Sequence, residues 1–138
     1  MLLISPLGLL SRPARATTVV PMTLATIADH AGQVILADIT VVRSAWADNP
    51  RRIETTITLS PVEYLKGAPG TASASTFTLI VPGGTVGDTQ MRITGAPDFR
   101  VGDRWMLCLL PTYKTHPVVG VSRGAFKIVS DDRGVQRV

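Results

Sequence analysis

Cys108 and His116 are the two side chains of this sequence that could work together as a nucleophile and its base. The cysteine, the single one in the chain, lies among apolar residues in WMLCLL at 105–110, so we expect a small buried side chain. The histidine lies in the polar stretch TYKTHP at 112–117, where we expect an exposed loop residue. A buried thiol and an exposed imidazole do not meet, so the sequence predicts no enzyme.

The residues that could bind a metal ion or a phosphate are too few and wrongly spaced. His30 and His116 stand far apart, without the spacing of a zinc site, and we expect His30 at the end of a helix. The pairs Asp48-Asn49 and Asp131-Asp132 each offer too few oxygens for calcium and are typical of turns. The segment VPGGTVGD at 81–88 lacks the Lys-Ser/Thr ending of a phosphate-binding loop. We therefore predict no metal and no cofactor.

Composition and charge indicate one globular domain with no large basic surface. The chain has 138 residues, of which 45% are hydrophobic and 17% charged, and its formal net charge is +4. Two of the arginines, Arg12 and Arg15, lie in a segment that we expect to be removed, and the other basic residues are scattered. A basic groove with aromatic platforms is not indicated, because only 5% of residues are aromatic.

The first sixteen residues, MLLISPLGLLSRPARA, have the apolar stretch and the small-x-small ending of a signal peptide. The segment departs from the usual pattern in having no Lys or Arg before Leu2. We predict cleavage after Ala16, a mature start at Thr17, a single domain at 17–138 and export to the periplasm or the medium. No other apolar run is long enough to span a membrane.

The stretch FRVGDRWMLCLL at 99–110 is the one around which a fold can be organised. Gly102-Asp103 is a turn signal, and a strand follows in which both faces are apolar. We predict a central strand between two apolar layers. One face carries Trp105, Leu107 and Leu109, and the other carries Met106, Cys108 and Leu110.

Short strands account for most of the remaining chain. We expect one helix, capped by Thr23, that runs to Ala31 and ends at Gly32. Pro61 requires a sheet edge or a bulge within its strand. The pattern predicts an all-β fold with one short N-terminal helix, a small closed or partly open OB-like β-barrel or, alternatively, a β-sandwich. The expected strands are 33–46, 53–64, 76–81, 90–94, 105–110, 118–121 and 125–129, with a turn at 132–134.

Several short motifs resemble those of an uncharacterised group of exported bacterial β-domains, over most of residues 23–129. They are LKG at 65–67, VPGG at 81–84, GAPDF at 95–99 and GDR at 102–104. More distantly, their order is similar to the netrin-like and tissue-inhibitor-of-metalloproteinase group, which implies an OB-fold scaffold. Those inhibitors act through an N-terminal cysteine, whereas this chain would begin at Thr17 and has no cysteine before Cys108. The resemblance therefore implies a fold and export, and no inhibitory residue.

Two kinds of function are compatible with these features. The first is a non-catalytic binding module of the cell envelope that uses its loops to hold a protein partner, such as a secreted protease. The alternative is binding of single-stranded nucleic acid or oligosaccharide on a barrel face, which the low aromatic content disfavours. For the first, we expect the loops at 68–75 and 111–117 to bind the partner through Thr71, Thr112, Tyr113, Lys114 and His116.

Overall fold

The computed structural model describes residues 21–48, 50–67 and 76–138. The predicted signal peptide at 1–16, the mature start at Thr17 and the loop at 68–75 lie outside these residues. The elements are α1 (Leu24–His30), β1 (Gln33–Ala47), β2 (Arg52–Lys66), β3 (Phe77–Pro82), β4 (Gly84–Val86), β5 (Thr89–Met91), β6 (Arg104–Leu109), β7 (Ala125–Ser130) and β8 (Gln136–Arg137).

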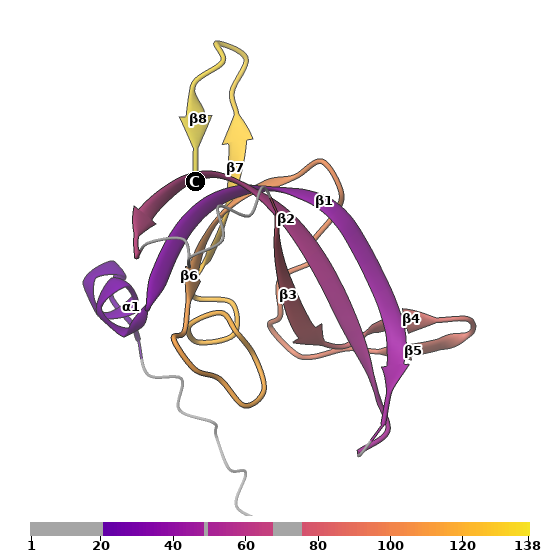
Figure 1. Cartoon of the computed structure of the whole chain (residues 1–138). Helices are drawn as coiled ribbons and strands as arrows, with labels where there is room; N and C mark the ends of the chain where they lie inside the picture. The colour runs from indigo at the N-terminus through magenta and orange to yellow at the C-terminus, as the bar shows by residue number, and fades with distance from the viewer. Residues whose placement is uncertain (1–20, 49, 68–75) are drawn as a thin grey trace, which may run out of the picture.

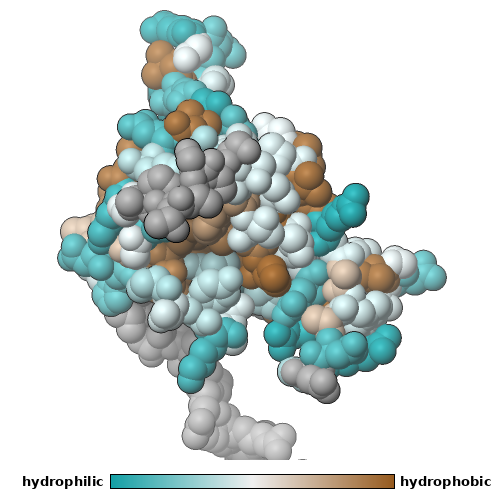
Figure 2. Space-filling model, viewed as in Figure 1, coloured by the Kyte–Doolittle hydropathy of each residue, from teal (hydrophilic) through white to brown (hydrophobic). Residues whose placement is uncertain are grey.

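One antiparallel sheet dominates the part of the chain that the structure describes. Its six strands lie in the order β3-β2-β1-β6-β7-β8. Strands β4 and β5 form a separate two-stranded hairpin. The edge strands β3 and β8 do not pair with each other, so the sheet is open. Figure 1 shows β1 and β2 arching over the molecule, with the β7–β8 hairpin projecting away from it, and the same projection is visible in the space-filling view of Figure 2. The prediction of a mostly β fold with one short helix is confirmed.

The two long strands, β1 and β2, bend because residues on them are left out of the pairing. Their register shifts leave Thr40 unpaired on β1, and Val62 and Leu65 unpaired on β2. Such bulges curve a strand and increase its twist. The bulge at Val62 adjoins Pro61, and β3 pairs with β2 only from Glu54 to Leu59. The prediction that Pro61 needs an edge or a bulge is therefore confirmed.

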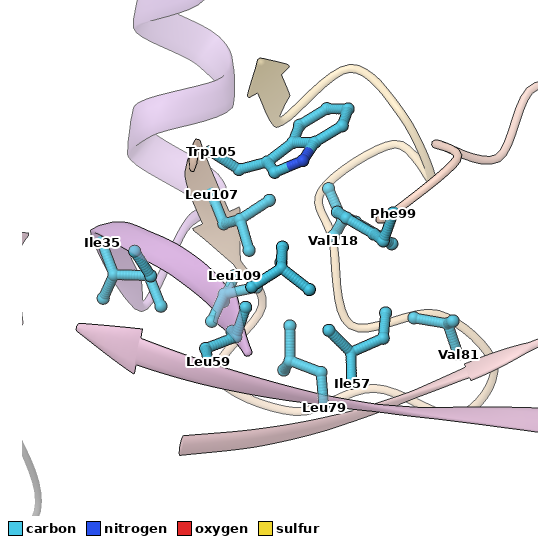
Figure 3. Packing of buried hydrophobic residues seen from close by; sticks show 12 residues of the cluster. Ile35, Ile57, Leu59, Leu79, Val81, Phe99, Trp105, Leu107, Leu109 and Val118 are labelled. Carbon is cyan, nitrogen blue, oxygen red and sulfur yellow. The ribbon is translucent and has the colours of Figure 1, made fainter. Parts of the chain in front are cut away.

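The central strand β6 separates two apolar clusters, as its sequence pattern predicts. Trp105, Leu107 and Leu109 belong to the cluster that the bent sheet encloses. Figure 3 shows Leu107 and Leu109 on the side of Leu59 and Leu79, whereas the ring of Trp105 lies toward Phe99, with 5.0 Å between the two ring centroids. Cys108 belongs to the cluster on the other side, under α1, where Ile27 of the helix is buried. Both faces of β6 are thus committed to packing.

Helix α1 begins after the predicted cap, Thr23, ends at His30, one residue before the predicted Ala31, and is hydrogen-bonded to the sheet. The side chain of Thr23 accepts a hydrogen bond from the N–H of Thr26 at 3.1 Å, as expected of an N-cap. At the other end, the Lys66 ammonium donates to the carbonyl oxygen of Ala28 at 2.7 Å. A Cβ on Gly32 would lie 2.8 Å from the Cβ of Pro111, so the helix leads into β1 through a contact that requires glycine.

Three strand predictions need correction. Residues 118–121 are not a strand: Val118 makes a single bridge with Leu109, and a turn follows, in which Val121 has a positive φ of 68°. The strand expected at 90–94 is shorter and earlier, at Thr89–Met91. The predicted turn at 132–134 is present, but it is followed by the short strand β8, which the sequence pattern did not predict.

The central position of β6 predicts a large effect of shortening Leu107, which is fully buried. Leu107→Ala should lower the free energy of unfolding by about 2–5 kcal/mol, since it removes methyl groups from a closed core. Leu65→Ala is the matched control, because Leu65 is 53% exposed, and it should change stability by less than about 1 kcal/mol. Urea titration measures both variants, and equal effects would contradict a central β6.

Candidate functional site

The inner face of β1, β2 and β3 provides the floor of the candidate site. Strand pairing places Val42 beside Ile57 and Ile57 beside Leu79. Two pairs further along, on the same face, Ser44 lies beside Thr55, and Thr55 beside Val81. Figure 3 shows Ile57 and Val81 among the packed side chains, on the same side of the strands as Phe99 and Val118. The floor is therefore apolar at one end and carries two hydroxyl groups at the other.

Residues 116–119 form a buried segment that is fixed to the end of β6. The N–H of Leu110 donates to the carbonyl oxygen of Pro117 at 2.8 Å, and the N–H of Val119 donates to that of Cys108 at 3.0 Å. Val118 packs in the enclosed cluster and Val119 in the cluster under α1. The 116–119 segment therefore continues both apolar layers past Ala125, the first residue of β7, which pairs with Leu107 of β6.

His116 is buried, and the expectation of an exposed loop histidine is wrong. Only 5% of the residue is exposed, because the chain turns inward after the polar residues Lys114 and Thr115. Its Nδ1 accepts a hydrogen bond from the N–H of Val118 at 3.2 Å, and Nε2 has no partner among the described residues. Burial lowers the pKa of His116 below its usual value, which favours the neutral ring.

A pocket of about 420 Å³ lies over the polar end of the floor. The β4–β5 hairpin and residues 90–99 supply its other walls, and His116 lines it as well. On the floor, Ser44 Oγ lies 2.8 Å from Thr55 Oγ1, which in turn donates to the carbonyl oxygen of Gly83 at 2.6 Å. We call this cavity the histidine pocket.

A second pocket, of about 390 Å³, lies where β3 begins. Phe77, Thr78 and Leu79 of β3 form one wall, and the end of β6 with the 111–117 turn forms the opposite wall. Tyr113 and Pro117 line it from that turn, and Tyr113 is 47% exposed. We call this cavity the tyrosine pocket. Since His116 lines one pocket and Pro117 the other, the buried segment lies between them.

The predicted binding residues are divided by this arrangement. Thr112, Tyr113 and Lys114 are exposed on one turn, as expected, and Tyr113 reaches the wall of the tyrosine pocket. His116 belongs to the histidine pocket instead. Thr71 lies outside the described residues. The sequence analysis predicted the strand but did not assign its start to a binding site, although Phe77 is an aromatic residue directly after a loop.

The cysteine and the remaining acidic groups give no assembled centre in the described part of the chain. Cys108 is buried under α1, and burial raises the pKa of its thiol. No group of three His, Cys, Asp or Glu side chains placed to hold a metal ion occurs in residues 21–48, 50–67 and 76–138. No helix within these ranges is long and apolar enough to cross a membrane.

Comparison with known proteins gives no relative: no family model, curated protein or solved structure matches this chain. The similarity to netrin-like domains and to exported bacterial β-domains therefore stays a prediction. Function has to be argued from the two pockets and the segment between them.

Burial of a neutral imidazole predicts a pH dependence of stability. Below about pH 6.5 the unfolded chain binds a proton at His116 while the native state resists it, so stability falls as the pH falls. His116→Asn, whose amide oxygen can still accept from Val118, should lose less stability between about pH 7.5 and about pH 5. Urea titrations at the two pH values measure this difference.

The control is Thr115→Asn, because Thr115 is exposed in the turn before His116 and has no titratable group. That variant should keep the pH dependence of the unaltered protein. If His116→Asn keeps it too, the imidazole is not held neutral in the fold.

Proposed function

We propose that this protein is an exported, non-catalytic binding module that holds an extended segment of a protein partner. In this proposal the leader at 1–16 is removed, and residues 17–138 form a partly open OB-like barrel. The binding surface is the tyrosine pocket together with the adjoining edge of β3. A secreted protease remains one class of partner that such a module could hold.

The observation that carries the proposal is the edge of β3 beside Tyr113. Strand β3 pairs with β2 on one side, and no strand of the described residues pairs with it on the other. An unpaired edge offers backbone N–H and C=O groups to which an extended peptide can add as a further strand. Ile80, whose side chain is 45% exposed, presents apolar surface on this strand. Main-chain hydrogen bonds would supply affinity, and the pocket would supply selectivity.

Tyr113 is suited to anchor such a peptide. It combines an apolar ring with a hydroxyl group, and side chains of this kind dominate many interfaces. It lines the pocket opposite Phe77, so a partner side chain that enters there would contact aromatic residues of two elements. The walls also include Leu79 and Leu109, which favours an apolar side chain as the occupant.

The alternative, binding of nucleic acid or oligosaccharide on the inner face of the sheet, has less support. Beyond the histidine pocket, that face is filled by core residues such as Leu59 and Leu79. Phe99 is the one aromatic residue of the described chain that lines the pocket, so the face offers no run of platforms for stacked bases or sugars. One exposed aromatic group does lie beside a cation: the guanidinium carbon of Arg51 is 4.6 Å from the ring centroid of Trp46. This pair makes Trp46 a useful comparison for Tyr113.

Selection of peptides from a displayed library on the full chain tests the proposal. For a selected peptide, Tyr113→Ala should weaken binding by at least about 1 kcal/mol and leave the free energy of unfolding unchanged, because Tyr113 is half exposed. N-methylation of alternate peptide backbone nitrogens should also abolish binding, since it removes strand-addition hydrogen bonds.

Trp46→Ala is the matched control, because Trp46 is 41% exposed and lines neither pocket. It should leave peptide affinity as it is. An affinity that depends on Trp46 and not on Tyr113 would contradict the proposed surface and favour the alternative.

A further inference from the structure

We propose that the histidine pocket is a second, independent binding site, and that its ligand is a small organic acid with an apolar body. The carboxylate would accept a hydrogen bond from His116 and face the positive charge of Arg92. The apolar body would lie on Ile57, Val81 and Phe99, which belong to the enclosed core and line this pocket. Its volume of about 420 Å³ is in the range of pockets that hold small molecules.

The first argument is the unpaired nitrogen of His116. Because Nδ1 accepts from the N–H of Val118, the neutral ring carries its proton on Nε2. That N–H is a donor, it is buried, and it has no acceptor among the described residues. A buried donor without an acceptor costs free energy. Nε2 has almost no exposed surface, so an oxygen in the pocket can accept from it only when the ring turns toward the cavity, and that contact would remove the cost. The ring therefore selects a ligand that accepts a hydrogen bond.

The second argument is that the hydroxyl groups on the floor cannot serve as further donors. Thr55 gives its single hydrogen to the carbonyl oxygen of Gly83, so Ser44 must donate to Thr55. Both hydrogens are used within the fold. Among the other side chains that line the cavity, His116 and Arg92 offer donors and no acceptor, whereas Thr85 and Gln90 can donate or accept, and this favours an anion over a cation.

The charges that line the pocket favour the same ligand. Asp98 is held by two hydrogen bonds from Arg100, at 3.0 Å and 2.7 Å. Arg92 takes part in none of the ion pairs that occur between described residues. A guanidinium without an acidic partner, in the same pocket as a neutral N–H donor, matches a carboxylate better than it matches a neutral molecule.

Benzoate tests the proposal, with benzyl alcohol as a neutral molecule of the same shape. The readout is the imidazole nitrogen spectrum of the full chain, in which His30 serves as an internal reference. Benzoate at millimolar concentrations should shift Nε2 of His116 saturably and leave His30 unchanged. Benzyl alcohol should bind about tenfold more weakly, since it lacks the charge-assisted hydrogen bond.

Two variants separate the pocket from a nonspecific effect of the anion. Arg92→Gln should weaken benzoate binding about tenfold and leave benzyl alcohol binding unchanged. Arg133→Gln removes an exposed cation from the distant β7–β8 turn and should change neither. Both positions are exposed, so neither variant depends on the core for folding.

Three results would overturn the proposal. The Nε2 resonance does not respond to benzoate, as expected if the ring never turns toward the cavity. Benzoate and benzyl alcohol bind equally well, which removes the carboxylate from the argument. Arg133→Gln weakens benzoate as much as Arg92→Gln does, which shows general attraction to a basic chain. Tyr113→Ala should leave benzoate binding intact, so failure here is distinguishable from failure of the peptide site.

Discussion

The hydrogen bonds between β6 and the chain that follows it are the constraint on which both candidate sites depend. Beyond Leu107, β6 has no partner in β7, and residues 117–124 take the place of that strand. The N–H of Cys108 donates to the carbonyl oxygen of Gly124 at 2.7 Å, and that of Gly124 donates to Val119 at 2.9 Å. A Cβ on Gly124 would lie 2.9 Å from the Cβ of Cys108, so this close approach requires glycine.

The packing of residues 116–124 against the end of β6 divides the apolar surface of the open sheet into two pockets. The turn at 111–115 stays in solvent and carries Tyr113, while the next residues enter the core. His116 then lines the pocket over the floor that carries Ser44 and Thr55, and Pro117 lines the pocket at the start of β3. A peptide at one pocket and a small acid at the other would thus bind on opposite sides of the same segment, and either could stabilise it by mass action.

Features that depend on neighbouring residues in the sequence could be predicted, and features that depend on contacts between distant segments could not. The two-sided packing of β6 follows from the alternation of Trp105, Leu107 and Leu109 with Met106 and Cys108, and the cap of α1 follows from Thr23. The burial of His116 could not be predicted, because Lys114 and Thr115 before it are polar and the segment that it begins is fixed by hydrogen bonds to the end of β6, which lie outside its own sequence pattern. Val118 and Val121 are both β-branched and indicated a strand. Gly120 and Val121 instead both have positive φ, which β-branched residues rarely adopt.

Native-state hydrogen exchange of backbone amides tests the docked segment most directly. The N–H groups of Cys108, Leu110 and Val119 should exchange as slowly as that of Leu107, because all belong to one cooperative unit with β6. Those of Thr112 and Lys114, in the exposed turn, should exchange quickly. If Leu110 and Val119 exchange as quickly as Thr112 while Leu107 stays protected, the segment is not fixed to β6, and neither pocket exists as described.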